Sequence, residues 1–258
     1  MQQASETPSI ILATLNARYV HSAIGLRCLF ANMQELKAAT VIREFTINDQ
    51  MQDVAEQLLA DNPEVIGLGV YIWNAEQTAE LVHILKRVSP ETVVVLGGPE
   101  VSYSPMRVDF SAADFVIQGE GDEAFYQLVK AIQSGLSPTE RIIKAPLPNV
   151  LTMVMPYDEY TDEDVAHRYI YVEASRGCPF QCEFCLSSID EKVRNFDTVL
   201  FLAALEKLWV RGVRNFKFID RTFNLNINIA SQLLDFFLSK PMPYFVHFEV
   251  IPDLFLRR

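Results

Sequence analysis

Short apolar runs rich in β-branched residues alternate with helical patterns along the first part of the chain. The apolar runs are Ser9–Leu15, Thr40–Phe45, Glu64–Val70, Thr92–Gly98 and Asp114–Gly119, and the helical patterns cover Ser22–Lys37, Met51–Ala60, Ala75–Val88 and Glu123–Ser134. Nearly continuous apolar strands that alternate with helices are typical of a parallel sheet covered on both faces. We therefore predict a doubly wound α/β domain over residues 1–136, either flavodoxin-like or Rossmann-like.

The hydrophobic pattern weakens after this domain. Residues 134–150 contain three prolines and little periodicity, and residues 155–168 are acidic and polar. Such composition is typical of a connection between domains. We predict a linker over residues 137–166, with one short strand at Arg141–Ala145.

A second strand–helix series begins at residue 167. It comprises a strand at Arg168–Ser175, a helix that Asp197 caps and Gly212 ends, a strand at Asn215–Asp220, a helix over 226–240 that Pro241 ends, and a strand at Tyr244–Val250. Repeated units of this kind indicate a β/α barrel, but three strands cannot close one. We expect residues 167–258 to form the N-terminal part of a β/α barrel that further chain completes; completion by a partner is the alternative.

Composition restricts the classes of function. Half of the 258 residues are hydrophobic, and the net charge of -11 argues against a large nucleic-acid interface, which needs clustered Lys and Arg. No apolar run approaches the ~18 residues of a membrane span. The N-terminus has neither a basic start nor an apolar signal core, so we expect a cytoplasmic protein without a membrane partner.

Three of the four cysteines lie within one short segment, as Cys178-x-x-x-Cys182-x-x-Cys185. Clustered thiols in a reducing compartment indicate metal or redox chemistry more often than disulfides. The incidental alternative, three cysteines without a shared ligand, fits so compact a pattern poorly.

The motif has no fourth cysteine nearby, and this limits the kinds of metal site that it can form. A structural zinc site commonly uses two Cys-x-x-Cys pairs, and only His167 or His247 could complete one here, neither at finger-like spacing. A ferredoxin cluster needs a fourth cysteine, and Cys28 lies in the other predicted domain. Three thiolates would leave one iron of a cubane cluster open to a small molecule.

The cysteine spacing, directly after a strand that begins a predicted barrel, resembles the signature of the radical S-adenosylmethionine (radical SAM) enzymes, and Phe184 before the third cysteine fits it. The resemblance implies a four-iron, four-sulfur cluster on Cys178, Cys182 and Cys185 whose open iron binds S-adenosylmethionine. It further implies an external low-potential electron donor of flavodoxin or ferredoxin type. Reductive cleavage of the cofactor would then give a 5′-deoxyadenosyl radical that abstracts hydrogen from the substrate.

The same resemblance implies contacts to S-adenosylmethionine. The backbone around Phe184 would meet the adenine, Asp220 the methionine amino group, and Glu249 the ribose hydroxyls. The alternatives are that Asp220 caps a turn and that Glu249 pairs with a surface lysine. We expect Arg176 and Gly177 to shape the cysteine loop rather than to take part in chemistry.

The first domain shows glycines where its fourth and fifth strands end, in Leu96–Ser102 and Gln118–Phe125. Glycine lets a ligand approach the backbone at the carboxyl edge of a doubly wound sheet, although Gly-Glu-Gly can also be only a tight turn. Neither segment is the Gly-x-Gly-x-x-Gly fingerprint, which disfavours a nicotinamide cofactor.

Together with the cysteine motif, these loops resemble the cobalamin-binding subclass of radical SAM proteins. The resemblance implies cobalamin across the strand ends, lined by Asn16, Arg18, Tyr19, Tyr71, Trp73, Asn74, Gly97, Gly98, Glu100, Gly119, Glu120 and Gly121. Tyr71 and Trp73 could equally be lid or core aromatics. One large class of cobalamin domains carries Asp-x-His-x-x-Gly in the first loop, whereas here Tyr19 takes the carboxylate position and His21 stands one residue out of step with Gly25. We predict cobalamin bound without histidine ligation.

The leading functional hypothesis is a cobalamin-dependent radical SAM enzyme that methylates an unactivated carbon of a small-molecule or peptide substrate. A radical rearrangement or hydrogen abstraction without methyl transfer is the first alternative, and a non-catalytic cofactor-binding fragment is the second. A tRNA methylthiotransferase is disfavoured, because that group carries three cysteines in its N-terminal domain and this domain has only Cys28.

Overall fold

The computed structural model describes residues 8–103, 106–180, 182–183, 185 and 192–256. Its backbone divides into two units, Met1–Pro148 and Asn149–Arg258. Each unit is described by itself below. No helix in the described ranges is long and apolar enough to cross a membrane.

The first unit is built on one parallel sheet of six strands. The strands are β1 (Ile10–Asn16), β2 (Thr40–Thr46), β3 (Val65–Gly69), β4 (Val93–Gly97), β5 (Phe115–Gln118) and β6 (Ile142–Lys144). Their order in the sheet is β2-β1-β3-β4-β5-β6. This is the flavodoxin-like order extended by β6, and its switch point, where ligands bind in such sheets, lies between β1 and β3.

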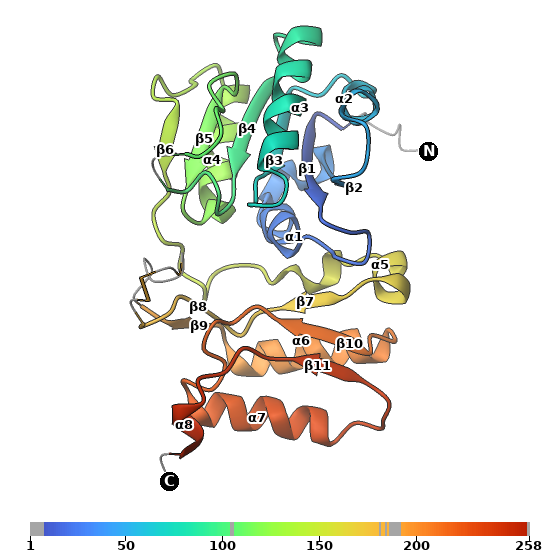
Figure 1. The fold of residues 1–258 in the computed structure, drawn as a ribbon, viewed down its shortest axis with the longest axis vertical. Coiled ribbons are helices and arrows are strands. Elements are labelled where there is room, and N and C mark those ends of the chain that lie inside the picture. Colours follow the sequence, from blue (N-terminus) through green and yellow to red (C-terminus); the bar gives the residue numbers. More distant parts are fainter. Residues whose placement is uncertain (1–7, 104–105, 181, 184, 186–191, 257–258) are drawn as a thin grey trace. The chain divides into compact units, whose positions relative to one another are not determined.

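Helices cover both faces of this sheet, as predicted (Figure 1). They are α1 (Ile24–Ala31), the 3₁₀ helix η1 (Gln34–Ala39), α2 (Met51–Leu59), α3 (Ala75–Val88) and α4 (Gly121–Gln133). One apolar layer joins the sheet to α2 and α3, and a second joins it to α1 and α4. Residues of β1 alternate between these two layers, because successive side chains of a strand point to opposite faces.

The single helix predicted over Ser22–Lys37 is wrong. The helix α1 ends at Ala31, where the side-chain amide of Asn32 donates to the carbonyl of Cys28 at 2.9 Å. Gln34 then takes a positive φ of 48°, so the chain cannot continue as one α-helix.

The interval predicted as a linker, 137–166, contains ordered elements. Strand β6 pairs with β5 in the first unit, close to the short strand predicted at Arg141–Ala145. In the second unit the interval forms the 3₁₀ helix η2 (Pro156–Glu159) and helix α5 (Asp162–His167). The buried Tyr157 and Tyr160 direct their hydroxyls to the carbonyls of Glu173 and Tyr171, at 3.0 and 2.7 Å. These tyrosines, set among acidic residues, give no periodic signal in the sequence.

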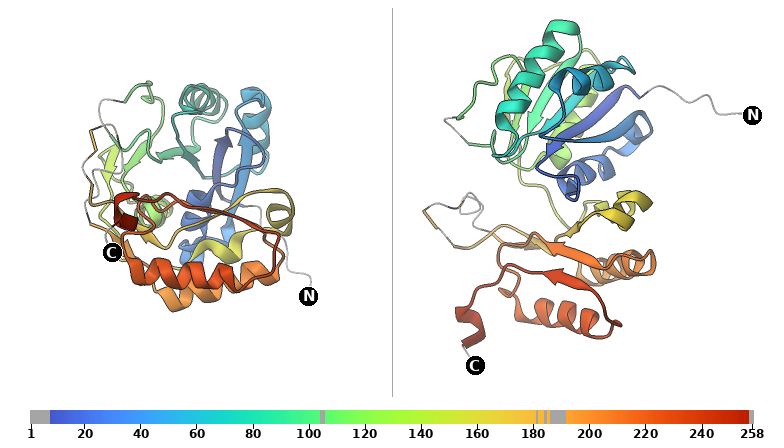
Figure 2. Two further views of the ribbon diagram at one scale, coloured as in Figure 1. Left: turned by 60° about the horizontal axis from the view of Figure 1, so that its bottom comes forward. Right: turned by 45° about the vertical axis from the view of Figure 1, so that its right-hand side comes forward.

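The second unit has a parallel sheet in the order β11-β10-β7, with β7 at Ile170–Val172, β10 at Asn215–Phe218 and β11 at Phe245–His247. Helices α6 (Thr198–Val210) and α7 (Ile227–Leu238) lie side by side along it, and the short helix α8 (Asp253–Leu256) follows (Figure 2). Asp197 caps α6 by accepting from the N–H of Leu200 at 2.9 Å, and Gly212 ends it with a φ of 104°. Both predictions about α6 are confirmed.

The predicted strand Arg168–Ser175 is shorter than expected. After β7 the chain leaves the sheet and forms β8 (Ser175–Arg176), which pairs antiparallel with β9 (Arg194–Asn195). This small ribbon flanks the segment that carries the cysteines. Three parallel strands with returning helices are the opening units of a β/α barrel, as predicted.

Candidate functional site

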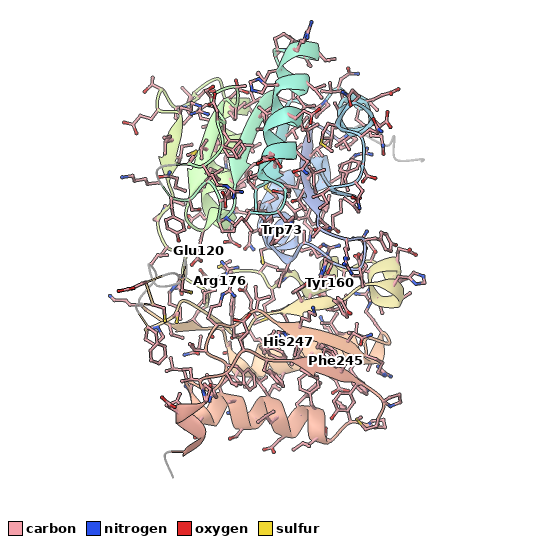
Figure 3. The ribbon with its side chains drawn as sticks, in the orientation of Figure 1. Trp73, Glu120, Tyr160, Arg176, Phe245 and His247 are labelled. Atoms are coloured by element: carbon pink, nitrogen blue, oxygen red, sulfur yellow. The ribbon has the colours of Figure 1, made fainter. Side chains whose placement is uncertain are left out.

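The loops after β1, β3 and β4 meet at the carboxyl edge of the first sheet, on both sides of its switch point. Figure 3 shows Trp73 and Glu120 at this same end of the first unit. Asn74, the residue before α3, is fully buried and ties the loops together. Its side-chain oxygen accepts from the N–H of Tyr71 at 2.8 Å, and its amide donates to the carbonyls of Leu15 and Gly69 at 3.0 and 3.1 Å.

The loop after β3 holds a rigid aromatic pair. The rings of Tyr71 and Trp73 stack with centroids 4.6 Å apart and an interplanar angle of 6°. The indole N–H of Trp73 donates to the carbonyl of Leu15 at 3.3 Å, while 44% of the residue stays exposed. Burial raises the pKa of the Tyr71 hydroxyl to about 12, and the nearby Cys28 and Glu44 add to the shift. The stacked pair is therefore fixed in orientation and exposes an apolar face to solvent.

The loop after β4 depends on glycine. Gly98 has a φ of 107°, and a Cβ there would lie 2.5 Å from the carbonyl oxygen of Val70. The hydroxyl of Ser102 joins this loop to the next by donating to the carbonyl of Gly98 at 2.8 Å and accepting from the N–H of Gly119 at 3.1 Å. A Cβ on Gly97, in contrast, would meet no atom within 4 Å. The end of β4 thus leaves open space beside its backbone.

The twelve residues predicted to line a cobalamin site differ in their exposure. Arg18, Tyr19 and Trp73 are exposed at the strand ends. Asn16 and Asn74 are buried at 6% and 0% exposure, so the structure gives them the role of loop supports rather than of surface contacts. The remaining members lie in the loops after β3, β4 and β5, at the end of β4 or at the start of α4: Tyr71, Gly97, Gly98, Glu100, Gly119, Glu120 and Gly121.

The sequence analysis missed Ile72, which is 64% exposed between the two aromatic residues. Its position in the loop after β3 was the available signal. With Tyr19 and Trp73 it forms an exposed apolar rim at the strand ends. Apolar rims around open backbone suit a large, flat cofactor, so the residues present fit cobalamin.

The cysteine motif lies in the second unit, between β8 and β9. Its three cysteines form no disulfide bond: Cys178 is buried, Cys182 exposed and Cys185 half-buried. The N–H of Cys185 donates to the carbonyl of Cys182 at 3.1 Å, which forms a turn that places these two residues close together. Gly177 has a φ of 92° just before the first cysteine. Phe184 lies outside the described residues.

The donor chemistry of the motif fits an iron–sulfur cluster, because reduced thiols are its usual protein ligands. Across the described ranges, no three Cys, His, Asp or Glu side chains are gathered as a metal site would require. The Nε2 atom of His167, one candidate for a zinc ligand, lies 3.8 Å from a carboxylate oxygen of Glu163. The other candidate, His247, is exposed on β11 (Figure 3). The structure does not bring either histidine to the cysteines as a ligand group.

Asp220 anchors the start of the cysteine loop. It is 2% exposed, and its carboxylate accepts from the N–H of Ala174 at 3.0 Å and from the hydroxyl of Ser175 at 2.7 Å. Burial raises the pKa of Asp220 to about 6, although these hydrogen bonds oppose the shift. In Arg176, the residue after Ser175, the guanidinium donates twice to one carboxylate oxygen of Glu173, at 2.7 and 3.0 Å. The segment leading to Cys178 is therefore held by Asp220 and by the pair of Arg176 with Glu173. Arg176 thus shapes the start of the cysteine loop, as predicted.

A cavity of about 390 Å³ opens beside Asp220. Its wall combines Asp220 and Ser175 with Asn195 of β9 and the first residues of α7, which begin at Ile227. This volume lies at the lower end of the range for small-molecule sites. Asp220 thus serves both as an anchor and as part of a cavity wall.

Glu249 has a different environment from Asp220. Its half-exposed carboxylate lies 3.2 Å from the guanidinium of Arg221. The sequence analysis gave a surface lysine as the alternative partner of Glu249, and in the structure an arginine takes that place.

Comparison with known proteins agrees with this geometry. Residues 10–129 match the B12 binding domain family. An uncharacterized methyltransferase of Pyrococcus horikoshii is 26% identical over 231 residues, which are 79% of this chain and 49% of that protein. The chain spans half or less of the length of the curated relatives it matches.

Two solved structures share the fold. One is the radical SAM methyltransferase TsrM from Kitasatospora setae with cobalamin and a 4Fe-4S cluster bound, with a TM-score of 0.65, 16% identity, and coverage of 88% of this chain and 50% of that chain. The other is the cobalamin-dependent radical enzyme OxsB with aqua-cobalamin and S-adenosylmethionine bound, with a TM-score of 0.69, 14% identity, and coverage of 93% and 38%.

The fold thus combines an α/β domain that matches the B12 binding domain family with the first strands of a β/α barrel, as in TsrM and OxsB, and the predicted fold class is confirmed. The resemblance to radical SAM proteins that carry a cobalamin-binding domain is confirmed with it.

Proposed function

We propose that this chain is part of a cobalamin-dependent radical SAM enzyme that transfers a methyl group to an unactivated carbon. One observation carries the proposal: residues 10–129 match a B12-binding domain, and the same chain continues into barrel strands that flank Cys178-x-x-x-Cys182-x-x-Cys185. The relative from Pyrococcus horikoshii and TsrM, both named as methyltransferases, support methyl transfer as the reaction.

In this proposal cobalamin lies across the carboxyl edge of the first sheet. The open backbone at Gly97 gives room for it, and the exposed faces of Tyr19, Ile72 and Trp73 contact its ring. Asn74 and Gly98 act beneath this surface by fixing the loops after β3 and β4. Preformed loops of this kind lower the entropic cost of binding.

Cys178, Cys182 and Cys185 would hold the cluster, and the cavity beside Asp220 would admit the methionine part of S-adenosylmethionine. Asp220 there faces the amino group, Glu249 the ribose, and the backbone near Phe184 the adenine. When bound, these groups supply reductive cleavage of S-adenosylmethionine and a methyl carrier. The residues of this chain bind and orient them, and an external low-potential donor supplies the electron.

A specific observation also favours the alternative of radical chemistry without methyl transfer. The OxsB structure is described as a radical enzyme and not as a methyltransferase, and its fold matches this chain with the higher TM-score of the two. The two reactions differ in whether cobalamin becomes methylated, which is measurable without knowledge of the substrate.

The test uses this chain after anaerobic reconstitution with iron and sulfide. Reduced protein is incubated with S-adenosylmethionine and hydroxocobalamin, and both 5′-deoxyadenosine and methylcobalamin are quantified by mass spectrometry. We expect both products, and neither from Cys182→Ala. 5′-Deoxyadenosine without methylcobalamin would favour the alternative reaction. Absence of both products from protein with a full complement of iron would leave a non-catalytic cofactor-binding fragment.

A further inference from the structure

A buried carboxylate holds the loop between β1 and α1. Glu44 lies on β2, in register with Thr14 of β1, and its side chain is 6% exposed. One carboxylate oxygen accepts from the N–H of Ala23 at 2.6 Å and from the side-chain amide of Asn16 at 2.9 Å. The two residues that bracket the loop therefore share one acceptor atom, supplied by a neighbouring strand.

The second oxygen of Glu44 binds a buried arginine. It lies 2.8 Å from the guanidinium of Arg27, whose side chain is 3% exposed on α1. A second nitrogen of Arg27 donates to the carbonyl of Ala23 at 3.0 Å, and the amide of Asn16 also donates to the carbonyl of His21 at 3.0 Å. The name Glu44 clamp is used below for Asn16, Ala23, Arg27 and Glu44.

The local sequence explains why the loop needs an outside acceptor. Ala23 is the N-cap of α1, and no side chain caps this helix. The carboxylate of Glu44 provides negative charge at the start of α1, where the helix dipole favours it. The clamp thus replaces a sequence-local cap and at the same time fixes both ends of residues 17–22.

A second ion pair on β2 allows an effect on the loop to be distinguished from a general effect on stability. Arg43 pairs with Asp61, and that pair is partly exposed on the opposite face of β2. It touches neither end of the loop after β1. A buried ion pair is in general weak evidence for stability, because desolvation offsets much of the attraction. What distinguishes the Glu44 pair is the loop that it orders.

We infer that Glu44 is a positioning residue for cobalamin: through Asn16 and Ala23 it fixes the loop that carries the exposed Arg18 and Tyr19 at the switch point of the sheet. This inference rests on the proposed cobalamin binding. It assigns a role to a strand residue outside the loops at the strand ends, and it needs no contact between Glu44 and the cofactor.

The experiment compares Glu44→Gln with Asp61→Asn in the whole chain. Hydroxocobalamin is titrated and followed by its visible absorption, and amide hydrogen exchange is measured over residues 17–23. For Glu44→Gln we expect an affinity reduced at least about tenfold and faster exchange in this segment, because glutamine has a single acceptor oxygen and cannot accept both from Arg27 and from the donors of Ala23 and Asn16. Asp61→Asn should match the wild type in both measurements.

Circular dichroism establishes that each variant is folded. If Glu44→Gln does not fold, Glu44→Asp retains the charge for Arg27 while shortening the reach to Ala23, and a smaller loss of affinity in the same direction is expected. Wild-type affinity and wild-type exchange in the folded Glu44 variant would overturn the inference. Absence of hydroxocobalamin binding to the wild type would instead overturn the proposed function on which it rests.

Discussion

The loops at the end of the first sheet and the cysteine loop of the second unit are held by different means. In the first unit, Asn74, Ser102 and the Glu44 clamp cross-link the loops at the strand ends through buried and part-buried hydrogen bonds. In the second unit, Asp220 and Glu173 fix only the approach to Cys178, and the thiols of the motif range from buried to exposed. The first arrangement is preformed, whereas the second fixes one end of a loop, and the proposed cluster would gather its thiols.

The largest expected effect concerns the cysteines. Replacing any one of Cys178, Cys182 and Cys185 with alanine should abolish the iron–sulfur absorption after anaerobic reconstitution, because in the proposed site each supplies one of only three thiolate ligands. Cys28→Ala, which removes the buried thiol of α1 in the first unit, is the matched control and should retain the absorption. A complete four-iron cluster in Cys182→Ala, or stoichiometric zinc without iron in the wild type, would contradict the assignment.

The second prediction tests the preformed loops through two adjacent glycines. Gly98→Ala should lower the free energy of unfolding of the first unit by about 2 kcal/mol or more, because the positive φ and the contact with Val70 both oppose a Cβ. Gly97→Ala meets open space and should change stability by less than about 0.5 kcal/mol. Urea denaturation followed by Trp73 fluorescence in a Trp209→Phe background measures both.

The Gly97 variant also tests the site. Its new methyl group occupies the open space at the end of β4, so hydroxocobalamin should bind more weakly to a protein of normal stability. Equal stability losses in the two glycine variants would show that the loop after β4 is not shaped as described.

The third prediction uses the buried carboxylate of Asp220. Its pKa of about 6 exceeds the ordinary value of 3.8, so the native state binds the proton more tightly than the unfolded chain does. The resulting contribution to stability is complete below about pH 4 and is lost as the pH rises through 6, a change of up to about 3 kcal/mol. Asp220→Asn should remove this dependence.

Denaturation of the iron-free protein at pH 4 and pH 7, followed by Trp209 fluorescence in a Trp73→Phe background, measures the effect in the second unit. Asp235→Asn, on the exposed side of α7, is the matched control. If Asp220→Asn and wild type change in parallel between these pH values, the carboxylate does not titrate as the structure indicates.

The same contrast between the two units governs what the sequence could predict. Buried parallel strands produce apolar runs, so β1 to β5 were placed within one or two residues of their bounds. The cysteine motif was visible because its three cysteines are close in sequence. Caps such as Asp197 were also predictable, since donor and acceptor lie three residues apart.

Contacts between distant residues were not predictable. Glu44 and Ala23 are 21 residues apart, and nothing in β2 marks Glu44 as different from a solvent-facing strand residue. Tyr157 reaches Glu173 across 16 residues from a segment that composition alone assigns to a linker. Asn74 was predicted from the sequence as a site residue, but only its hydrogen bonds show that it supports the loop from beneath.

The fourth prediction concerns Glu249, where a smaller effect is expected. Glu249→Gln should weaken S-adenosylmethionine binding to the reconstituted protein about tenfold, the equivalent of one hydrogen bond to a charged group. Iron content should not change, and stability should fall by less than about 0.5 kcal/mol because the pair with Arg221 is exposed. Lys207→Gln, which breaks the exposed pair with Asp158, is the control. Wild-type affinity in Glu249→Gln would remove this residue from the site.

The smallest expected effect, a null result, concerns His21 in the preformed loop after β1. The backbone N–H of His21 donates to the carbonyl of Arg18 at 3.1 Å, and its carbonyl accepts from Asn16, so this turn is set by main-chain bonds and the Glu44 clamp. A histidine that ligates cobalt is usually supported by a carboxylate on its second nitrogen, and the equivalent sequence position here holds Tyr19. His21→Ala should therefore leave the electron paramagnetic resonance spectrum of bound Co(II) cobalamin unchanged, without axial nitrogen splitting in either protein. A nitrogen splitting that disappears in His21→Ala would show that the loop moves its imidazole onto the metal, and the first unit would then be no more preformed than the cysteine loop.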